Sequence, residues 1–278
     1  MLDKLHEISY ERIQRLIIKV NSKLRLPKKV KLAIDFTEKE YYGDKRHPAV
    51  MGSKEGKYVR MYIEVSTVKP ALFINAFPVN QFTNNKKKLL KQLLDGFHRL
   101  YEKTKIDLLL LDRGFFTKAV IAFLIRNKIP FVMPAVKNKA IKSLAEQFRK
   151  GWLPDRIKYE FGKYEINLLF LKVKDDILVY ATNTRKSPKG AHTLYRNRWQ
   201  IETNFREQNN FVFQTKTRNF AVRYLAFALG GLLFNAWQLT RDKTIYKMES
   251  HLYKHFLKEE VLKLWQEFAS EEIIKSLE

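Results

Sequence analysis

The 278-residue sequence lacks cysteine altogether, and this absence restricts the chemistry that is open to the protein. Without cysteine there can be no disulfide, no thiolate nucleophile and no cysteine-ligated zinc site. The absence also fits a reducing compartment. We therefore expect a cytoplasmic protein whose site chemistry depends on oxygen and nitrogen atoms.

A secretory leader and a long apolar run are missing as well. The opening residues, MLDKLHEISYERIQRLI, are charged and amphipathic, which is not the pattern of a signal peptide. The most apolar stretch, Tyr224–Leu239, is shorter than a bilayer span and contains Gly-Gly and an asparagine. We expect a buried core helix at this position and no membrane partner.

Acidic residues are scarce relative to basic ones. The chain carries 53 Lys and Arg against 29 Asp and Glu, for a net charge of +24. Such a charge attracts polyanions, and nucleic acid is the expected partner. The alternative is the charged surface of a thermophilic protein, but that surface would mix both signs. From Tyr246 onward five basic residues face seven glutamates, so we do not expect the C-terminal tail to contact DNA.

Hydrophobic periodicity predicts a mixed α/β sheet with helices on its faces. An amphipathic helix is expected within residues 1–27, and further helices within 86–104 and 117–128. Residues 58–68 alternate in the manner of a half-buried strand. The predicted strands of this part of the chain are 29–36, 58–68, 71–79, 106–112 and 129–134.

A β-rich segment interrupts this order between residues 135 and 190. A basic stretch precedes three short predicted strands, which are joined by a Gly-Lys turn and an Asp-Asp turn. Between Lys137 and Lys189 there are 13 basic and six acidic residues. We expect this insertion to line a groove for DNA.

Three carboxylates stand out in this basic chain. Asp35 and Asp112 are each expected to end an apolar strand, and open α/β sheets bind ligands at strand ends. The stretch YRNRWQIETNFREQNN reads as a helix and places Tyr195, Arg198 and Glu202 on one face. Three carboxylates suit Mg²⁺, and two ions about 3.5–4 Å apart can support phosphodiester cleavage.

Each carboxylate also has a simpler interpretation. An aspartate at the end of a strand is often a turn former or a helix cap. Glu202 alone would more often be a solvated partner of Arg198 or Arg206, four residues away on either side. The metal-site hypothesis therefore depends on the three residues together.

Four stretches together resemble the DDE transposases of the insertion-sequence-four superfamily: AIDF, YYGD, LLLLDRGFFT and YRNRWQIETNFRE. The group has the signature Tyr-x2-Arg-x3-Glu-x6-Lys, and Tyr195, Arg198 and Glu202 fit its first three places. The resemblance covers about residues 30–240. It implies an RNase H-like mixed sheet flanked by helices and interrupted by a β-rich insertion.

This resemblance implies five segments along the chain. They are an N-terminal helical segment (1–29), the first part of the catalytic domain (30–134), the insertion (135–190), the second part of the catalytic domain (191–245) and a helical tail (246–278).

The resemblance also implies an activity. Asp35, Asp112 and Glu202 would hold two Mg²⁺ or Mn²⁺ ions for hydrolysis at transposon ends. The freed 3′ hydroxyl would then attack target DNA. Tyr195 and Arg198 would hold phosphates of the double-stranded transposon end, in a synaptic complex formed by a homodimer in a prokaryotic cell.

The chain departs from the signature at its last place, where Asn209 replaces lysine. Asparagine can hydrogen-bond a phosphate oxygen but brings no charge, and Arg206 or Lys216 could supply that charge instead. Two alternatives therefore stay open. One is a metal-dependent DNA nuclease that does not join strands, and the other is a catalytically decayed DNA-binding protein.

Overall fold

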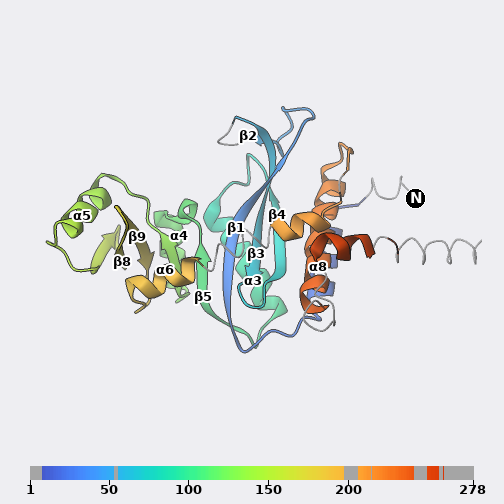
Figure 1. The fold of residues 1–278 in the computed structure, drawn as a ribbon. Helices are drawn as coiled ribbons and strands as arrows, with labels where there is room; N and C mark the ends of the chain where they lie inside the picture. The colour runs from blue at the N-terminus through green and yellow to red at the C-terminus, as the bar shows by residue number, and fades with distance from the viewer. Residues whose placement is uncertain are drawn as a thin grey trace, which may run out of the picture.

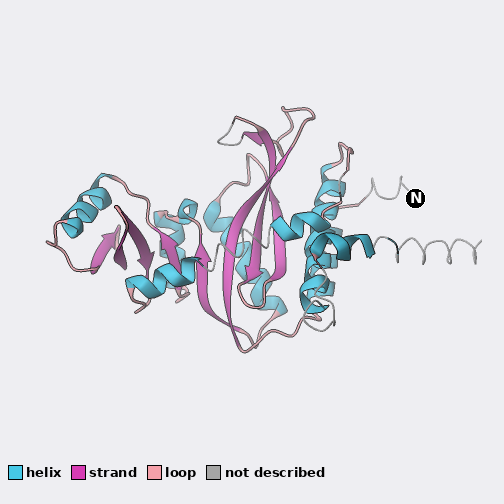
Figure 2. Ribbon diagram, in the orientation of Figure 1, coloured by secondary structure: helices cyan, strands magenta, loops and turns pink. Residues whose placement is uncertain are grey.

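The computed structural model describes residues 8–52, 56–196, 206–213, 215–240, 249–256 and 259. Within these residues, nine strands form one mixed sheet (Figures 1 and 2). The strands are β1 (Lys29–Glu40), β2 (Met51–Gly52), β3 (Tyr58–Thr67), β4 (Leu72–Val79), β5 (Lys105–Leu111), β6 (Phe131–Pro134), β7 (Arg156–Phe161), β8 (Tyr164–Val173) and β9 (Asp176–Thr182).

The helices are α2 (Tyr10–Asn21), α3 (Lys86–Leu100), α4 (Lys118–Arg126), α5 (Lys139–Arg149), α6 (Pro188–Arg196) and α8 (Phe220–Thr240), with a 3-10 turn η1 (Arg113–Phe115). Residues 206–211 and 250–256 are helical as well.

The order of the strands defines the architecture. β4 and β2 both pair with β3, which runs antiparallel to β1. β1, β5 and β6 are parallel, because helices α3 and α4 return the chain to the same end of the sheet. The structure confirms the predicted mixed sheet flanked by helices, and the three antiparallel strands followed by parallel ones fit the RNase H-like architecture that the resemblance implied.

Helices cover both faces of this sheet. On one face, α3, α4 and α5 bury a continuous core that includes Leu93, Leu124, Ile141 and Leu109. On the other face, α2 and α8 pack over β3 and β4, while α6 lies against β6, β8 and β9. β3 is therefore buried at most positions, and not half-buried as its alternating sequence suggested.

β1 is longer than its apolar residues indicated. The strand was expected to end at Asp35, but it continues to Glu40, so Asp35 lies near its middle. The extension is held by antiparallel pairing with β3, which runs as far as Glu40 opposite Val59. Hydropathy does not indicate that the polar residues after Phe36 belong to the strand, because the contribution of backbone pairing cannot be read from side-chain hydropathy.

The insertion contains the three predicted strands β7, β8 and β9, and also helix α5, which was not predicted. β9 pairs antiparallel with β6, so the insertion continues the main sheet. In Figure 1 it extends the sheet away from α8. The boundaries that we assigned to the five segments stay a prediction.

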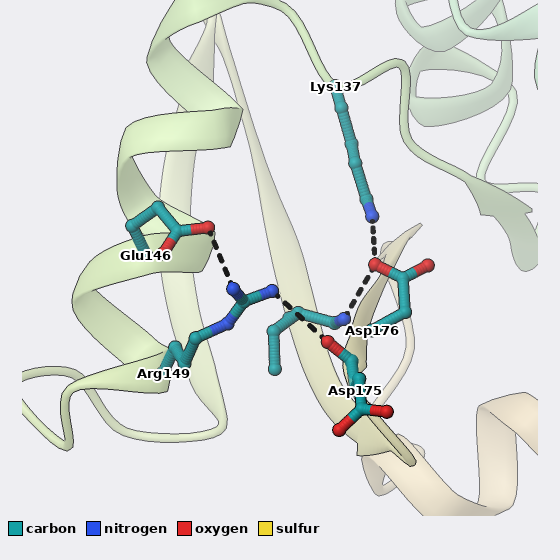
Figure 3. A network of polar contacts seen from close by, with 6 residues as sticks. Lys137, Glu146, Arg149, Asp175 and Asp176 are labelled. Atoms are coloured by element: carbon teal, nitrogen blue, oxygen red, sulfur yellow. Dashed lines mark hydrogen bonds and ion pairs between the residues drawn. The ribbon is translucent and has the colours of Figure 1, made fainter.

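Polar contacts attach α5 to the β8–β9 turn at the outer end of the insertion (Figure 3). Lys137 Nζ lies 2.9 Å from Asp176 Oδ1, and this hydrogen bond lowers the pKa of the Asp176 carboxyl. Arg149 donates to the Asp175 carbonyl at 3.3 Å and pairs with Glu146. Two of the basic side chains of the insertion thus form contacts within the protein itself.

Helix α8 is the predicted core helix. It is long and apolar enough to cross a membrane, but 56% of its most apolar window is buried inside the protein, and buried core helices often meet the same criteria. Gly230 and Gly231 allow a close approach that no other residue would permit. A Cβ atom on Gly231 would lie 2.6 Å from Cγ of the fully buried Phe73 in β4.

We predict that Gly231→Ala destabilises the protein by about 1–3 kcal/mol, because the added methyl overpacks the contact with Phe73. This cost should exceed the gain in helix propensity of at most about 1 kcal/mol. Urea unfolding measures the difference. Gly190→Ala in α6 is the matched control, because its Cβ would meet only the Ser187 hydroxyl, and it should be neutral or stabilising. Equal stability of Gly231→Ala and wild type would contradict the packing argument.

Candidate active site

The pairing of β1 with β5 places Asp35 beside Asp112. The two strands are parallel, with Ile34 opposite Leu111, so the next residue of each chain is an aspartate. Adjacent strands lie about 4.8 Å apart, and residues in register on parallel strands point to the same face. Both aspartates are partly exposed. The structure therefore brings together two of the three carboxylates singled out from the sequence.

Local contacts support the backbone around both aspartates. Asp112 caps the turn η1 by accepting a hydrogen bond from the Gly114 amide at 3.3 Å, and Lys86 of α3 donates to the Gly114 carbonyl at 2.7 Å. On the opposite face of the sheet, the rings of Phe36 and Phe115 stack with centroids 5.2 Å apart. Each ring lies close in sequence to one aspartate, so this apolar contact holds the two chain segments together.

A polar stripe continues from Asp35 along β1 and β3. In the antiparallel register Asp35 is opposite Glu64 and Lys39 is opposite Arg60. Because side chains alternate along a strand, all four project to the face that α8 partly covers. Glu64 and Arg60 are buried, with 1% and 8% of their surface exposed. Charged side chains are rarely buried in a sheet without a role.

Glu64 connects this stripe to the helical residues 206–211. Its side chain accepts hydrogen bonds from the Ser66 hydroxyl at 2.7 Å and from the Gln208 amide at 3.2 Å. Burial raises the pKa of Glu64 to about 8, against the opposing effect of these two donors. The carboxyl is therefore mostly neutral at neutral pH. Because Glu64 lies opposite Asp35 in the sheet, its hydrogen bond places Gln208 near Asp35.

Lys39 is linked to the same helical residues. Its ammonium group donates to the side-chain oxygen of Asn209, the residue that stands where the signature has lysine. Burial lowers the pKa of Lys39 to about 8, while the nearby Glu64 raises it. A lysine from β1 thus brings a positive charge to the side chain of Asn209.

The other predicted site residues are distributed as follows. Tyr195 lies in the last turn of α6, where its ring is 5.5 Å from that of Tyr180. Arg206, Asn209 and Lys216 are exposed. Arg198 and Glu202 lie outside the residues that the structure describes.

In the part of the chain that the structure describes, no group of three or more His, Asp or Glu side chains is arranged to hold a metal ion. Asp35 and Asp112 still offer the hard oxygen donors that Mg²⁺ and Mn²⁺ prefer. Two adjacent carboxylates in a basic protein fit a divalent cation that needs at least one more ligand.

The sequence reasoning missed Lys39, Arg60 and Glu64. A signal was present, because Arg60, Glu64 and Ser66 occupy alternate positions of an otherwise apolar strand. On the sequence alone, this alternation predicts a solvent-facing side of the strand. It is instead a largely buried polar face, because α8 and residues 206–211 lie over it.

We predict that Glu64→Gln changes how stability depends on pH. The folded-state pKa of Glu64 is raised above its unfolded value, so wild-type stability is lost as pH rises from about 5 to 8. Glutamine cannot ionise, so the variant should gain stability relative to wild type over this window by roughly 1–4 kcal/mol. Chemical denaturation at several pH values measures it. Parallel pH profiles of the two proteins would show that Glu64 does not titrate in this window.

Comparisons with known proteins agree with this geometry. A family model described as the transposase DDE domain matches residues 26–230, well over half of the chain. Among solved structures, the cryo-EM structure of a piggyBac transposase synaptic complex with hairpin DNA matches with a TM-score of 0.64 and 14% identity. The match covers 87% of this chain and 53% of that chain, so this protein spans about half the length of its structural relative. A search of curated proteins finds no match. The match of the family model over residues 26–230 shows that the chain belongs to the transposase DDE domain family.

Proposed function

We propose that this protein is a DNA transposase that cleaves transposon ends and joins the freed 3′ hydroxyl to target DNA. The observation that carries the proposal is the placement of Asp35 beside Asp112 on adjacent parallel strands, within a transposase DDE domain. The net charge of +24 suits a polyanionic substrate. Double-stranded DNA is the partner that we propose, bound by a homodimer in the cytoplasm.

Members of this family use divalent metal ions. We propose that Asp35, Asp112 and Glu202 are the carboxylate ligands for two Mg²⁺ or Mn²⁺ ions. When bound, such ions activate the attacking water or hydroxyl and stabilise the leaving oxygen. The protein's own contribution is to hold the carboxylates at one phosphodiester and to keep the DNA backbone in place.

The neighbours of Glu202 in the chain support its role. On one side, Tyr195 packs against the buried cluster that contains Ala33 of β1. On the other side, Gln208 is hydrogen-bonded to Glu64, opposite Asp35 in the sheet. The described residues on either side of 197–205 thus both contact the sheet face that carries the two aspartates, which supports Glu202 as the third carboxylate.

DNA-end binding is the proposed role of Tyr195, Arg198, Arg206, Asn209 and Lys216. Arginine suits this role because its guanidinium group can donate two hydrogen bonds to one phosphate. With Tyr195, Arg198 and Glu202 in the signature spacing, we also propose membership of the insertion-sequence-four superfamily. The groove formed by the insertion stays a prediction.

We propose that Lys39 replaces the missing signature lysine. It contacts the Asn209 side chain, and its pKa of about 8 leaves it mainly charged at neutral pH. The charge that the signature places on the helix would then come from β1. This interpretation favours an active transposase over a decayed one.

The carboxylate and arginine roles predict opposite phenotypes. Asp35→Asn should reduce metal-dependent cleavage of the element's own ends by several orders of magnitude and leave DNA binding intact, because one charge is lost from the metal site. Arg198→Ala should weaken end binding by about 1–3 kcal/mol and retain the metal site. Cleavage gels with Mg²⁺ or Mn²⁺ and DNA-binding titrations measure both effects.

Asp107→Asn is the matched control, because Asp107 lies on β5 and is paired with Lys31, five residues before Asp112. It should cleave like wild type. Cleavage without strand joining would favour the nuclease alternative. A wild type without metal-dependent cleavage, whose DNA binding is unchanged by Asp35→Asn, would favour the DNA-binding alternative.

The Lys39 proposal predicts a rescue. Lys39→Gln should weaken binding of the duplex end by about 1–3 kcal/mol, because a charged contact is lost. The double variant Lys39→Gln/Asn209→Lys moves the charge back to the helix and should recover most of the affinity. Lys91→Gln, on the far face in α3, controls for the change in net charge. Failure of the double variant to recover affinity would reject the replacement.

A further inference from the structure

A basic pocket of about 590 Å³ lies beyond the carboxylates on the same side of the sheet. Its walls come from β1 and the following loop, from β3, from residues 212–218 and from the first half of α8. Five cationic side chains line it, against the single carboxylate of Glu40: Lys39, Arg60, Lys216, Arg218 and Arg223. Of these five, Lys39 and Lys216 also belong to the proposed DNA-end site.

The carboxylate of Glu40 is already engaged outside this cation group. It pairs with Lys57 at 2.6 Å and accepts a hydrogen bond from the Tyr42 hydroxyl. Across the described ranges of the chain, no salt bridge joins any of the five cations to a carboxylate. Within the described residues, the pocket therefore holds positive charge that no carboxylate pairs with.

Arg60 is the least solvated of these cations. It is only 8% exposed, its guanidinium donates to the Tyr62 hydroxyl at 2.7 Å, and its buried Nε has no hydrogen-bond partner among the described residues. Arg223 lies near enough that burial and then the charge of Arg60 lower its pKa. Two guanidinium groups that repel each other in a partly desolvated pocket are costly unless an anion lies between them.

Aromatic side chains surround this charge. Tyr62 and Phe227 stack at the base of the pocket, with centroids 4.2 Å apart and planes 4° from parallel. At its edge Tyr42 is 88% exposed and Phe213 is 47% exposed. Exposed rings beside cations are the combination that binds single-stranded nucleic acid, because unpaired bases stack on the rings while the cations hold phosphates. A duplex backbone offers no free base face to such rings.

We propose that this pocket binds a nucleotide of single-stranded DNA, with its phosphate between Arg60 and Arg223 and its base on Phe213. The proposal rests on the proposed function in that DNA is the partner. Lys39, at the pocket wall, follows Asp35 by four residues, about 13 Å along the same face of β1. A strand that leaves the carboxylates could therefore enter the pocket and be held there.

The test is a titration of labelled single-stranded and duplex oligonucleotides by fluorescence anisotropy, with EDTA present so that no metal contributes. Arg223→Gln removes a cation that holds the phosphate, and Phe213→Ala removes the ring on which the base stacks. Each should weaken single-strand binding about five- to tenfold, and for Phe213 the loss of one stacked base accounts for at least this much. Duplex affinity should change less than about twofold. Arg99→Gln on α3, an exposed arginine on the far face, is the control and should leave both affinities unchanged.

Phe213 is exposed and Arg223 only partly buried, so both variants should fold, and thermal unfolding checks this. Unchanged single-strand affinity would overturn the proposal. An equal loss for duplex would indicate a duplex groove, and a mononucleotide that binds as tightly as the oligonucleotide would indicate a free-nucleotide site. Asp35→Asn should retain single-strand binding, so a failed cleavage test and a failed pocket test remain distinguishable.

Discussion

The parallel pairing of β1 with β5 is the constraint on which the rest of the site depends. Leu32, Ala33 and Ile34 lie opposite Leu109, Leu110 and Leu111, and this apolar register is followed by one aspartate on each strand. A slip of one residue would turn one aspartate to the opposite face of the sheet. Both faces of these strands are covered by helices, so hydrophobic packing on both sides specifies the register and, through it, the relative position of Asp35 and Asp112.

The same packing makes it energetically costly to bury polar side chains on the shared face of β1 and β3. Glu64 and Arg60 are buried where an apolar side chain would be more stable, and Glu64 is mostly neutral as a result. Natural proteins break the rule of apolar burial chiefly at functional sites. Here the buried polar groups connect the sheet to residues 206–211 through Gln208, and they leave a cationic pocket beside the carboxylates.

The insertion extends the main sheet and shares its hydrophobic core instead of forming a separate one. Its strand β9 pairs with β6, so residues such as Leu168 and Phe170 join the core that α3 and α4 form with the first strands. The contacts of Lys137 with Asp176 and of Arg149 with the Asp175 carbonyl hold α5 at the outer end. Built in this way, the insertion continues the main sheet, and its role in lining a groove for DNA stays a prediction.

The sequence by itself indicated the mixed sheet, most of its strands and helices, the core helix α8 and the position of Asp35 and Asp112 in two apolar strands. These features depend on local periodicity and on turn residues, which can be recognised within a short stretch of the sequence. It did not reveal that β1 continues to Glu40, that α5 forms, or that β9 pairs with β6. Each of these depends on backbone hydrogen bonds or burial supplied by distant segments.

Only the tertiary structure brought Lys39 to Asn209 and Arg60 to Arg223. The two residues of each pair are more than 150 positions apart in the sequence, so no local pattern indicates that they meet. Their properties arise from desolvation, which is a property of the surroundings. The sequence therefore pointed to Asp35 and Asp112 as candidate site residues, while the fold decided which cationic side chains lie near them.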